Sequence, residues 1–315
     1  MIRRLILGFI LFAFPLCVAQ SIAVHAPPTV ERGLPLQLMI HPAQASGTVR
    51  ASIEDATGRS IARAVGFSVM SGRDIESTAV LLGVPSTVEP GRYRIRIEYS
   101  EGRNSLPRVR YRELQVLDRD YFDSTIALSM AMSELRTTTD PKRYRETREL
   151  MDLLGRFRPD AIFALGEMVL PVVGEDVRVS ARFGDRRQFH YADGGWGGSI
   201  HNGLDLAAPT GTPVVASASG KVVFAGDRLI TGYSVVLEHL PGVYGLYYHL
   251  DSLATVTGEF VRRGEELGTV GATGLVTGPH LHWEIRVSGV AVEPEWFLAK
   301  PLLDTQQLFS IIKNE

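Results

Sequence analysis

The sequence predicts a mainly β protein in three parts: an immunoglobulin-like β-sandwich, a helical hairpin linker and a C-terminal antiparallel β domain. Three observations predict this fold class. Residues 24–118 contain short segments in which apolar and polar side chains alternate with a period of two. Residues 119–158 carry the start and stop signals of helices. From about residue 160 the chain returns to short apolar strands separated by glycines, and its 315 residues are enough for two domains.

The first twenty residues are typical of a secretory signal peptide. Arg3 and Arg4 precede an apolar run over residues 5–16, which is too short to span a bilayer, and small residues lie near Ala19. An uncleaved N-terminal anchor is the alternative. We therefore expect an exported protein of the periplasm or cell envelope, without an integral membrane span in the mature chain.

Cys17 is the only cysteine, so a hydrophobic core or a metal, rather than disulfides, would hold the mature protein together.

Residues 24–118 predict the β-sandwich. In "PGRYRIRIEYS" the side chains of Tyr93, Ile95, Ile97 and Tyr99 share one face, and the other face carries Arg92, Arg94, Arg96 and Glu98. Several such strands, separated by Gly and Pro turns, favour a sandwich of immunoglobulin-like type. Polar residues do not gather into a chemical site here. This domain is therefore expected to be a spacer or a surface for a protein partner.

Residues 119–158 predict a helical hairpin linker between the two domains. In "DPKRYRETRELMDLLG", Asp140 is placed to cap the helix N-terminus, Pro141 suits the first helical position and Gly155 suits the C-terminal cap. "DSTIALSMAMSELR" precedes it and is expected to form a partner helix.

The chain's net charge of −2 gives no strong positive electrostatic potential that would favour nucleic acid as a partner.

A first polar cluster lies in "HNGLDLAAPTGTP". His201 and Asp205 are four residues apart, but Gly203 between them and the prolines that follow argue against a helix. A bent strand or loop can still bring both side chains to one point. His and Asp are ordinary ligands of Zn²⁺, although this spacing alone is weak evidence.

A second cluster lies in "GPHLHWEIR". In a strand, residues two apart point the same way, so His280, His282 and Glu284 are predicted to share one face. The alternate residues, Leu281 and Trp283 among them, would then belong to the core. A pair of histidines that merely lines a solvated face is an equally weighted interpretation at this point.

His249 in "YGLYYHLDSL" completes the set. Alternation in this segment places His249 with Tyr247 on the polar face of a predicted strand, opposite Leu246, Tyr248 and Leu250. A catalytic zinc takes three protein ligands and leaves a position for water, so these five polar positions exceed what a zinc needs. Surplus histidines would handle protons, but spacing alone does not assign which histidine has which role.

These motifs together resemble a known family. "HNGLD" with "GPHLH" is similar to the double signature of the lysostaphin/LytM-type zinc metallopeptidases, which cut peptide bonds in peptidoglycan. The resemblance covers roughly residues 179–297, from "ARFGDRR" through "YGLYYHL" to "VRRGEELGTVGATGLVTGPHLHWEIRVSG". Motif order and spacing agree throughout. The resemblance does not extend to the N-terminal β domain or the linker.

The resemblance implies roles for all five residues. His201, Asp205 and His282 would be the zinc ligands, and His249 and His280 the two catalytic histidines that do not bind the metal. The implied domain, residues 160–300, is a small antiparallel β structure, related in part to biotinyl and lipoyl carrier domains, and residues 301–315 would form a C-terminal tail. The implied function is zinc-dependent hydrolysis of peptide bonds in peptidoglycan. The alternative is a non-catalytic peptidoglycan-binding activator of a cell-wall amidase, as in members of the family that have lost ligands.

The segment "RRQFHYADGGWGGSI" before His201 is expected to form a wall of the groove. Trp196 and Tyr191 in it are candidates for substrate contact, with loop packing as the equally weighted alternative.

Overall fold

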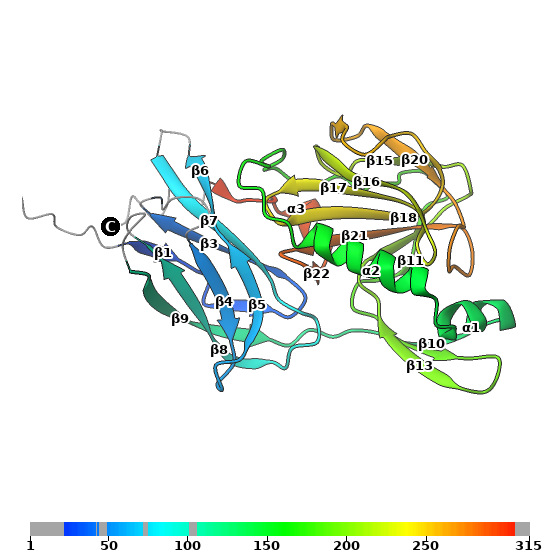
Figure 1. Ribbon diagram of the computed structural model, residues 1–315, viewed down its shortest axis with the longest axis horizontal. Coiled ribbons are helices and arrows are strands. Elements are labelled where there is room, and N and C mark those ends of the chain that lie inside the picture. The colour runs from blue at the N-terminus through cyan, green and yellow to red at the C-terminus, as the bar shows by residue number, and fades with distance from the viewer. Residues whose placement is uncertain (1–21, 42, 44–48, 72–74, 101–105, 306–315) are drawn as a thin grey trace, which may run out of the picture.

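A computed structural model of the chain describes residues 22–305, apart from residues 42, 44–48, 72–74 and 101–105. The expected signal peptide over residues 1–20 lies outside the described residues, as does the chain from residue 306 onward. Two β-rich bodies lie side by side, with the helices of the segment that links them along one side of the second body (Figure 1). Among the described residues, no helix has the length and apolarity needed to cross a membrane.

The N-terminal body contains two sheets. The first has the strand order β1 (Ala23–His25), β3 (Pro35–His41), β7 (Ile75–Gly83) and β6 (Phe67–Ser71). The second has the order β2 (Thr29–Glu31), β9 (Arg108–Leu117), β8 (Gly91–Tyr99), β4 (Arg50–Glu54) and β5 (Ser60–Val65). Neighbouring strands are antiparallel except for β2, which pairs in parallel with β9.

Period-two alternation builds the core between these sheets. On β8, Ile95, Ile97 and Tyr99 are almost completely buried, while Arg96 and Glu98 between them are only partly buried. They belong to one apolar cluster with Leu38 of β3 and Val80 of β7 from the facing sheet. The inward face that the sequence indicates for β8 is therefore the face that packs in the sandwich.

The second face of the first sheet packs against the C-terminal body. Phe67 and Leu81 belong to the same apolar cluster as Val287 of the C-terminal body. Ser288 also donates a hydrogen bond to the carbonyl of Leu81, with a distance of 2.8 Å. The two bodies thus share a continuous core, rather than being joined through a linker alone.

The segment after the sandwich contributes a strand as well as helices. It contains β10 (Asp123–Ala127), α1 (Met130–Thr137) and α2 (Pro141–Leu154). The Asp140 side chain accepts a hydrogen bond from the Lys142 amide at 2.7 Å, as expected of an N-cap, and Gly155 ends the helix. The strand β10 was not foreseen from the sequence.

β10 belongs to a separate three-stranded sheet. It pairs in parallel with β12 (Arg186–His190), which pairs in turn with β13 (Trp196–Ile200). The segment that the sequence assigns to the linker is therefore hydrogen-bonded to the insert that precedes His201. Figure 1 shows this sheet below α2, at the edge of the C-terminal body.

The C-terminal body is built on a ten-stranded sheet in which every pairing is antiparallel. Its main path runs β11 (Arg178–Ala181), β14 (Leu204–Ala207), β21 (His280–Val287), β18 (Val243–Leu253), β17 (Gly232–Leu240), β16 (Gly220–Arg228) and β19 (Phe260–Val261). Three short strands lie off this path: β15 (Pro213–Val215), β20 (Glu266–Val270) and β22 (Val290–Val292). A short helix, α3 (Trp296–Ala299), follows.

The two faces of this sheet differ. One face carries the main core, which includes Leu281, Trp283 and Ile285 of β21, each fully buried. On the other face, Leu153 and Leu154 of α2 pack in a smaller apolar cluster with side chains of β17 and β18. α2 thus covers one part of that face.

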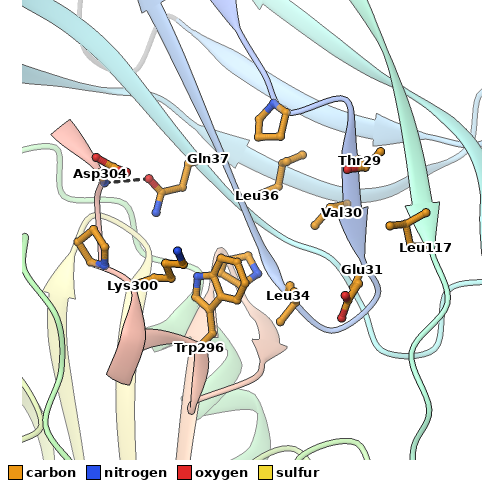
Figure 2. Close-up of a pocket in the computed structure, with 13 residues that line it drawn as sticks. Thr29, Val30, Glu31, Leu34, Leu36, Gln37, Leu117, Trp296, Lys300 and Asp304 are labelled. Atoms are coloured by element: carbon orange, nitrogen blue, oxygen red, sulfur yellow. Dashed lines mark hydrogen bonds between the residues drawn. The ribbon is translucent and has the colours of Figure 1, made fainter. Parts of the chain in front are cut away.

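Residues 301–304 pack against the sandwich. Leu302 and Leu303 are buried in the main core, and the Asp304 amide donates a hydrogen bond to Gln37 at 3.0 Å. Figure 2 shows this contact beside a pocket of about 370 Å³, where Trp296 faces strands β2 and β3. The start of the expected C-terminal tail is therefore part of the packed interface between the two bodies.

Candidate metal centre

Three side chains converge at one end of the large sheet. His201 Nε2 lies 2.9 Å from Asp205 Oδ1 and 3.0 Å from His282 Nδ1, and His282 Nδ1 lies 2.8 Å from the same Asp205 oxygen. These three atoms form a compact triangle. They come from positions 81 residues apart in the chain, so the fold, not local sequence, makes the site.

Sheet register places two of the three side chains side by side. Asp205 on β14 is paired with His282 on β21, and His282 is paired in turn with Tyr248 on β18. Directly opposed residues in adjacent strands project to the same face, so this row lies on the face opposite Trp283. The Tyr248 ring stacks on the His282 ring, with centroids 5.5 Å apart. The aromatic ring thus fixes the plane of the imidazole.

Gly203 allows His282 to take this position. A Cβ at residue 203 would lie 2.4 Å from the carbonyl oxygen of Trp283 and 2.9 Å from the His282 ring. Both distances are shorter than atoms tolerate. The glycine in "HNGLD" therefore lets the first histidine segment approach β21 closely.

Each histidine of the triangle is oriented through its second nitrogen. His201 Nδ1 donates to the carbonyl of Arg182 at 2.7 Å, which leaves the Nε2 lone pair directed at the triangle. His282 directs Nδ1 inward, and its Nε2 lies 3.6 Å from the buried carboxylate of Glu284. This pattern of outer contacts is the one that metal-ligating histidines use.

The charges of the site favour a bound cation. Burial raises the pKa of Asp205, but its contacts with the His201 and His282 rings lower it more, so the carboxyl stays ionised. Burial lowers the pKa of His282, but the contacts with Asp205 and Glu284 raise it to about 9. His282 therefore holds its proton firmly, at the place where three ligand atoms meet and where a metal ion would replace that proton. Two imidazoles and one carboxylate, oriented in this way, fit the ligand set of Zn²⁺.

Arg187 contacts the other oxygen of the ligand carboxylate. Its Nη2 lies 2.7 Å from Asp205 Oδ2, and the two side chains are 19% and 8% exposed. Oδ1 therefore faces the histidines while Oδ2 is held by the arginine. Arg187 comes from β12, so the small three-stranded sheet supports the site directly.

His249 reaches the site through an irregularity in β18. Its φ is +65°, a left-handed conformation, and the pairing of β18 with β17 shifts register between Tyr247 and Leu250. Tyr247 is fully buried and pairs with Trp283, whereas Tyr248 faces His282. Strict alternation would turn His249 toward the core, together with Tyr247. The bulge returns it to the chemical face.

The two remaining histidines flank the triangle. The ring centroids of His249 and His280 are 5.0 Å apart, and His280 Nε2 lies 3.7 Å from Asp205 Oδ1. His249 Nδ1 donates to the Thr273 carbonyl and His280 Nδ1 to that of Gly278, both at 2.8 Å. Each ring therefore keeps an Nε2 lone pair. Burial lowers the pKa of His249 to about 3, so this imidazole is neutral.

These side chains lie in a groove of about 610 Å³. The large sheet contributes the histidine face, β10, β12 and β13 contribute one wall, and α1 and α2 contribute another part. The insert therefore lines the groove through Arg187, Phe189, Ser199 and Ile200. Trp196 does not line it: this side chain is 62% exposed and packs on His190, with ring centroids 4.7 Å apart. The loop-packing interpretation of Trp196 is the one that the structure supports.

All five residues singled out in the sequence meet in this groove. Tyr248, which the alternation places on the opposite face, stacks on His282 instead. The contacts of two further residues were not predicted. Arg187 is 18 residues from Asp205 and gave no motif signal, because only the pairing of β10, β12 and β13 brings it near. Glu284 was placed on the histidine face, but its contact with His282 follows from burial that spacing does not reveal.

Comparisons with known proteins agree with this arrangement. Residues 199–294 match the model of Peptidase family M23. Over 117 residues, the chain is 45% identical to the DD-carboxypeptidase/endopeptidase Mpg of Neisseria meningitidis and 39% identical to the peptidoglycan DD-endopeptidase ShyC of Vibrio cholerae. Each match covers 37% of this chain but 26% of the relative, so the chain spans about a quarter of the length of these curated relatives.

A solved structure extends the likeness beyond the matched region. A Pseudomonas aeruginosa protein described as a peptidase M23 superposes with a TM-score of 0.54 at 25% sequence identity. The superposition covers 82% of this chain and 95% of that one. It therefore includes more of the chain than the groove-bearing domain alone.

Proposed function

We propose that this chain, whose residues 199–294 form a domain of peptidase family M23, is a zinc-dependent endopeptidase that hydrolyses peptide bonds in peptidoglycan. The observation that carries the proposal is the triangle of His201 Nε2, Asp205 Oδ1 and His282 Nδ1, flanked by two further histidines. Relatives named as peptidoglycan DD-endopeptidases support the choice of substrate.

In this proposal His201, Asp205 and His282 hold the metal. A zinc ion bound there supplies a Lewis acid for the scissile carbonyl and lowers the pKa of water. Arg187 keeps the carboxylate of Asp205 oriented so that Oδ1 faces the metal position. Glu284 and Tyr248 fix the His282 ring from two sides.

His249 and His280 handle the protons. Because each donates Nδ1–H to a backbone carbonyl, each offers an Nε2 that accepts a proton from the attacking water. Once protonated, the same nitrogen donates a hydrogen bond to the developing oxyanion or returns the proton to the leaving amine. Backbone carbonyls, rather than carboxylates, orient both rings.

The division of roles has a direct test. His282→Ala should lose both zinc and activity, while His280→Ala should keep zinc and lose activity. Zinc content by metal analysis and peptide release from purified peptidoglycan measure the two properties separately. If His280→Ala emptied the site as well, the division would be wrong.

The enzyme proposal is tested with the wild-type chain. Peptides should be released from purified peptidoglycan, release should stop with a chelator, and mass spectrometry should identify the bond that is cut. A zinc-loaded protein that binds peptidoglycan without cutting it would instead support the non-catalytic activator. The presence of all five polar positions in one groove favours the enzyme.

We further propose that the protein is exported to the periplasm or cell envelope, where its substrate lies. The apolar segment after Arg3 and Arg4 supports this placement. We propose that residues 24–118 form a β domain that is available to a protein partner and is packed on the C-terminal body through their shared core. Fractionation of cells that produce the full chain tests the location.

A further inference from the structure

The groove contains more positive charge than its own acidic groups neutralise. Among the described residues that line it, the arginines and the acidic residues are Arg136, Arg143, Arg187, Arg228, Arg286, Asp185, Asp205 and Glu284. Arg187 is paired with Asp205, and Arg286 with Glu284. The other three arginines form no ion pair with a described carboxylate. Their charge is therefore available to a bound molecule.

Arg136 lies near the metal centre, on the wall of the groove that β12 forms. On β12, Arg187 and Phe189 are two residues apart and share a face, so they are separated by about 7 Å. Arg187 contacts Asp205, whereas Phe189 lies under the Arg136 guanidinium, 3.8 Å from its ring centroid. This cation–π contact supports the guanidinium and leaves its N–H groups available to a carboxylate.

Arg143 extends the same wall. Its Nη1 donates a hydrogen bond to the backbone carbonyl of Arg136 at 2.7 Å, and this bond holds the Arg143 side chain next to Arg136. Arg143, Thr147 and Leu150 are spaced by four and three residues, and this stripe of α2 lines the groove. Both arginines come from the helical hairpin, outside the region that matches the peptidase family.

The floor adds a third cation. Arg228, at the end of β16, is only 9% exposed, and its Nη2 donates to the carbonyl of Glu146 at 3.0 Å. A buried, unpaired guanidinium carries its full charge into the groove, because little water is present to screen it. The three arginines thus raise the electrostatic potential in the groove that contains the metal centre.

We infer that this wall selects peptides that carry free carboxylates, and that Arg136 and Arg143 bind one such carboxylate beside the scissile bond. The inference rests on the proposed peptidase function and names the chemical class of its substrate. Arginine is suited to the task, since its planar fork matches a carboxylate with two parallel hydrogen bonds. A positive groove also concentrates acidic peptides relative to neutral ones.

The experiment compares two cross-linked peptides that differ at one position, where a free carboxylate is replaced by a carboxamide of the same shape. The wild type should cleave the acid with a kcat/KM roughly fivefold higher, as expected for partly exposed ion pairs. The preference should shrink as salt is raised, because salt screens exposed charges.

Variants assign the preference to the wall. Arg136→Gln with Arg143→Gln should cleave both peptides at the rate at which the wild type cleaves the amide. Arg145→Gln is the matched control, because Arg145 is exposed on α2 and does not line the groove. Zinc content and thermal melting should match the wild type in every variant used. A pair of Lys substitutions at 136 and 143 keeps the charge and should retain part of the preference.

Two results would overturn the inference. Equal cleavage of the carboxylate peptide and the carboxamide peptide by the wild type would show that the arginines do not recognise the carboxylate. A preference that survived in the double Gln variant would place the carboxylate elsewhere. If neither peptide nor intact peptidoglycan were cleaved at all, the proposed function itself would fail, which is a distinguishable outcome.

Discussion

Replacing Arg187 with Gln should weaken zinc binding about 10- to 100-fold. The change removes the guanidinium that lies 2.7 Å from Asp205 Oδ2, in a contact whose partners are 19% and 8% exposed. A hydrogen bond to a charged group contributes roughly 1.5–3 kcal/mol. Since about 1.4 kcal/mol corresponds to a factor of ten in affinity, the loss amounts to one or two powers of ten.

The assay is competition between the purified protein and a fluorescent zinc chelator. It reports affinity without any need for substrate, so it separates metal positioning from catalysis. Arg186→Gln is the control, because it makes the same charge change on the same strand, while Arg186 donates to the Ser86 carbonyl rather than to a ligand. This control variant should keep the zinc affinity of the wild type.

The reasoning is refuted by a specific result. If Arg187→Gln binds zinc within twofold of the wild type while its melting profile shows an intact fold, then the contact does not orient the ligand. Lower activity with unchanged zinc affinity would mean that Arg187 acts on the substrate instead. Arg187→Lys should lie between wild type and Gln, since lysine keeps the charge but not the fork.

Three further outcomes are expected. Gly203→Ala should lower zinc affinity in the chelator assay, because the added Cβ would meet the Trp283 carbonyl at 2.4 Å and the His282 ring at 2.9 Å; unchanged affinity would contradict the close approach. Chelation of zinc should lower the melting temperature, since a metal at 100 times its Kd stabilises the folded state by about 2.7 kcal/mol; calorimetry with and without chelator measures the shift. Burial lowers the pKa of His239 from 6.5 to about 4. Its contribution to stability is therefore complete above about pH 6.5 and falls as the pH drops toward 4, by roughly 2 kcal/mol at pH 5. Urea unfolding of His239→Gln should lack this share of the loss, and an unchanged acid slope would refute it.

The alternation of β21 is the part of the site that the sequence predicts best. A strand with period two places His280 and His282 on one face, and the fully buried Leu281 and Trp283 confirm the other face. The pattern is readable because both faces are under strong and opposite constraints: one must be apolar to pack, and the other must be polar to bind. The mainly β fold was predictable for the same reason.

His249 shows where such reasoning reaches its limit. The alternation predicted that His249 would face the site together with Tyr247, and His249 does face it, but Tyr247 lies in the core. The placement depends on a residue with φ of +65° in a bulge, which no apolar pattern marks. The prediction of position was confirmed, and the reason given for it was wrong.

The contact between Arg187 and Asp205 was beyond prediction for a different reason. It requires β12 to lie between β13 and a strand, β10, that comes from the far side of the helical hairpin. Parallel pairing between segments about 60 residues apart leaves no local signature. The sequence indicated only helices between the two β domains.

The shared core between the sandwich and the C-terminal body has a consequence for the proposed peptidase activity. Since Phe67 and Leu81 share one apolar core with Val287, the sandwich is held against the C-terminal body, and its described residues do not line the groove. A flexible linker would let the groove reach bonds in every direction around the point at which the sandwich is bound. A fixed contact between the two bodies restricts the groove to bonds at one distance and one orientation from the point at which the sandwich is bound. If the sandwich binds a partner, that partner would therefore set the direction from which the proposed substrate reaches the groove.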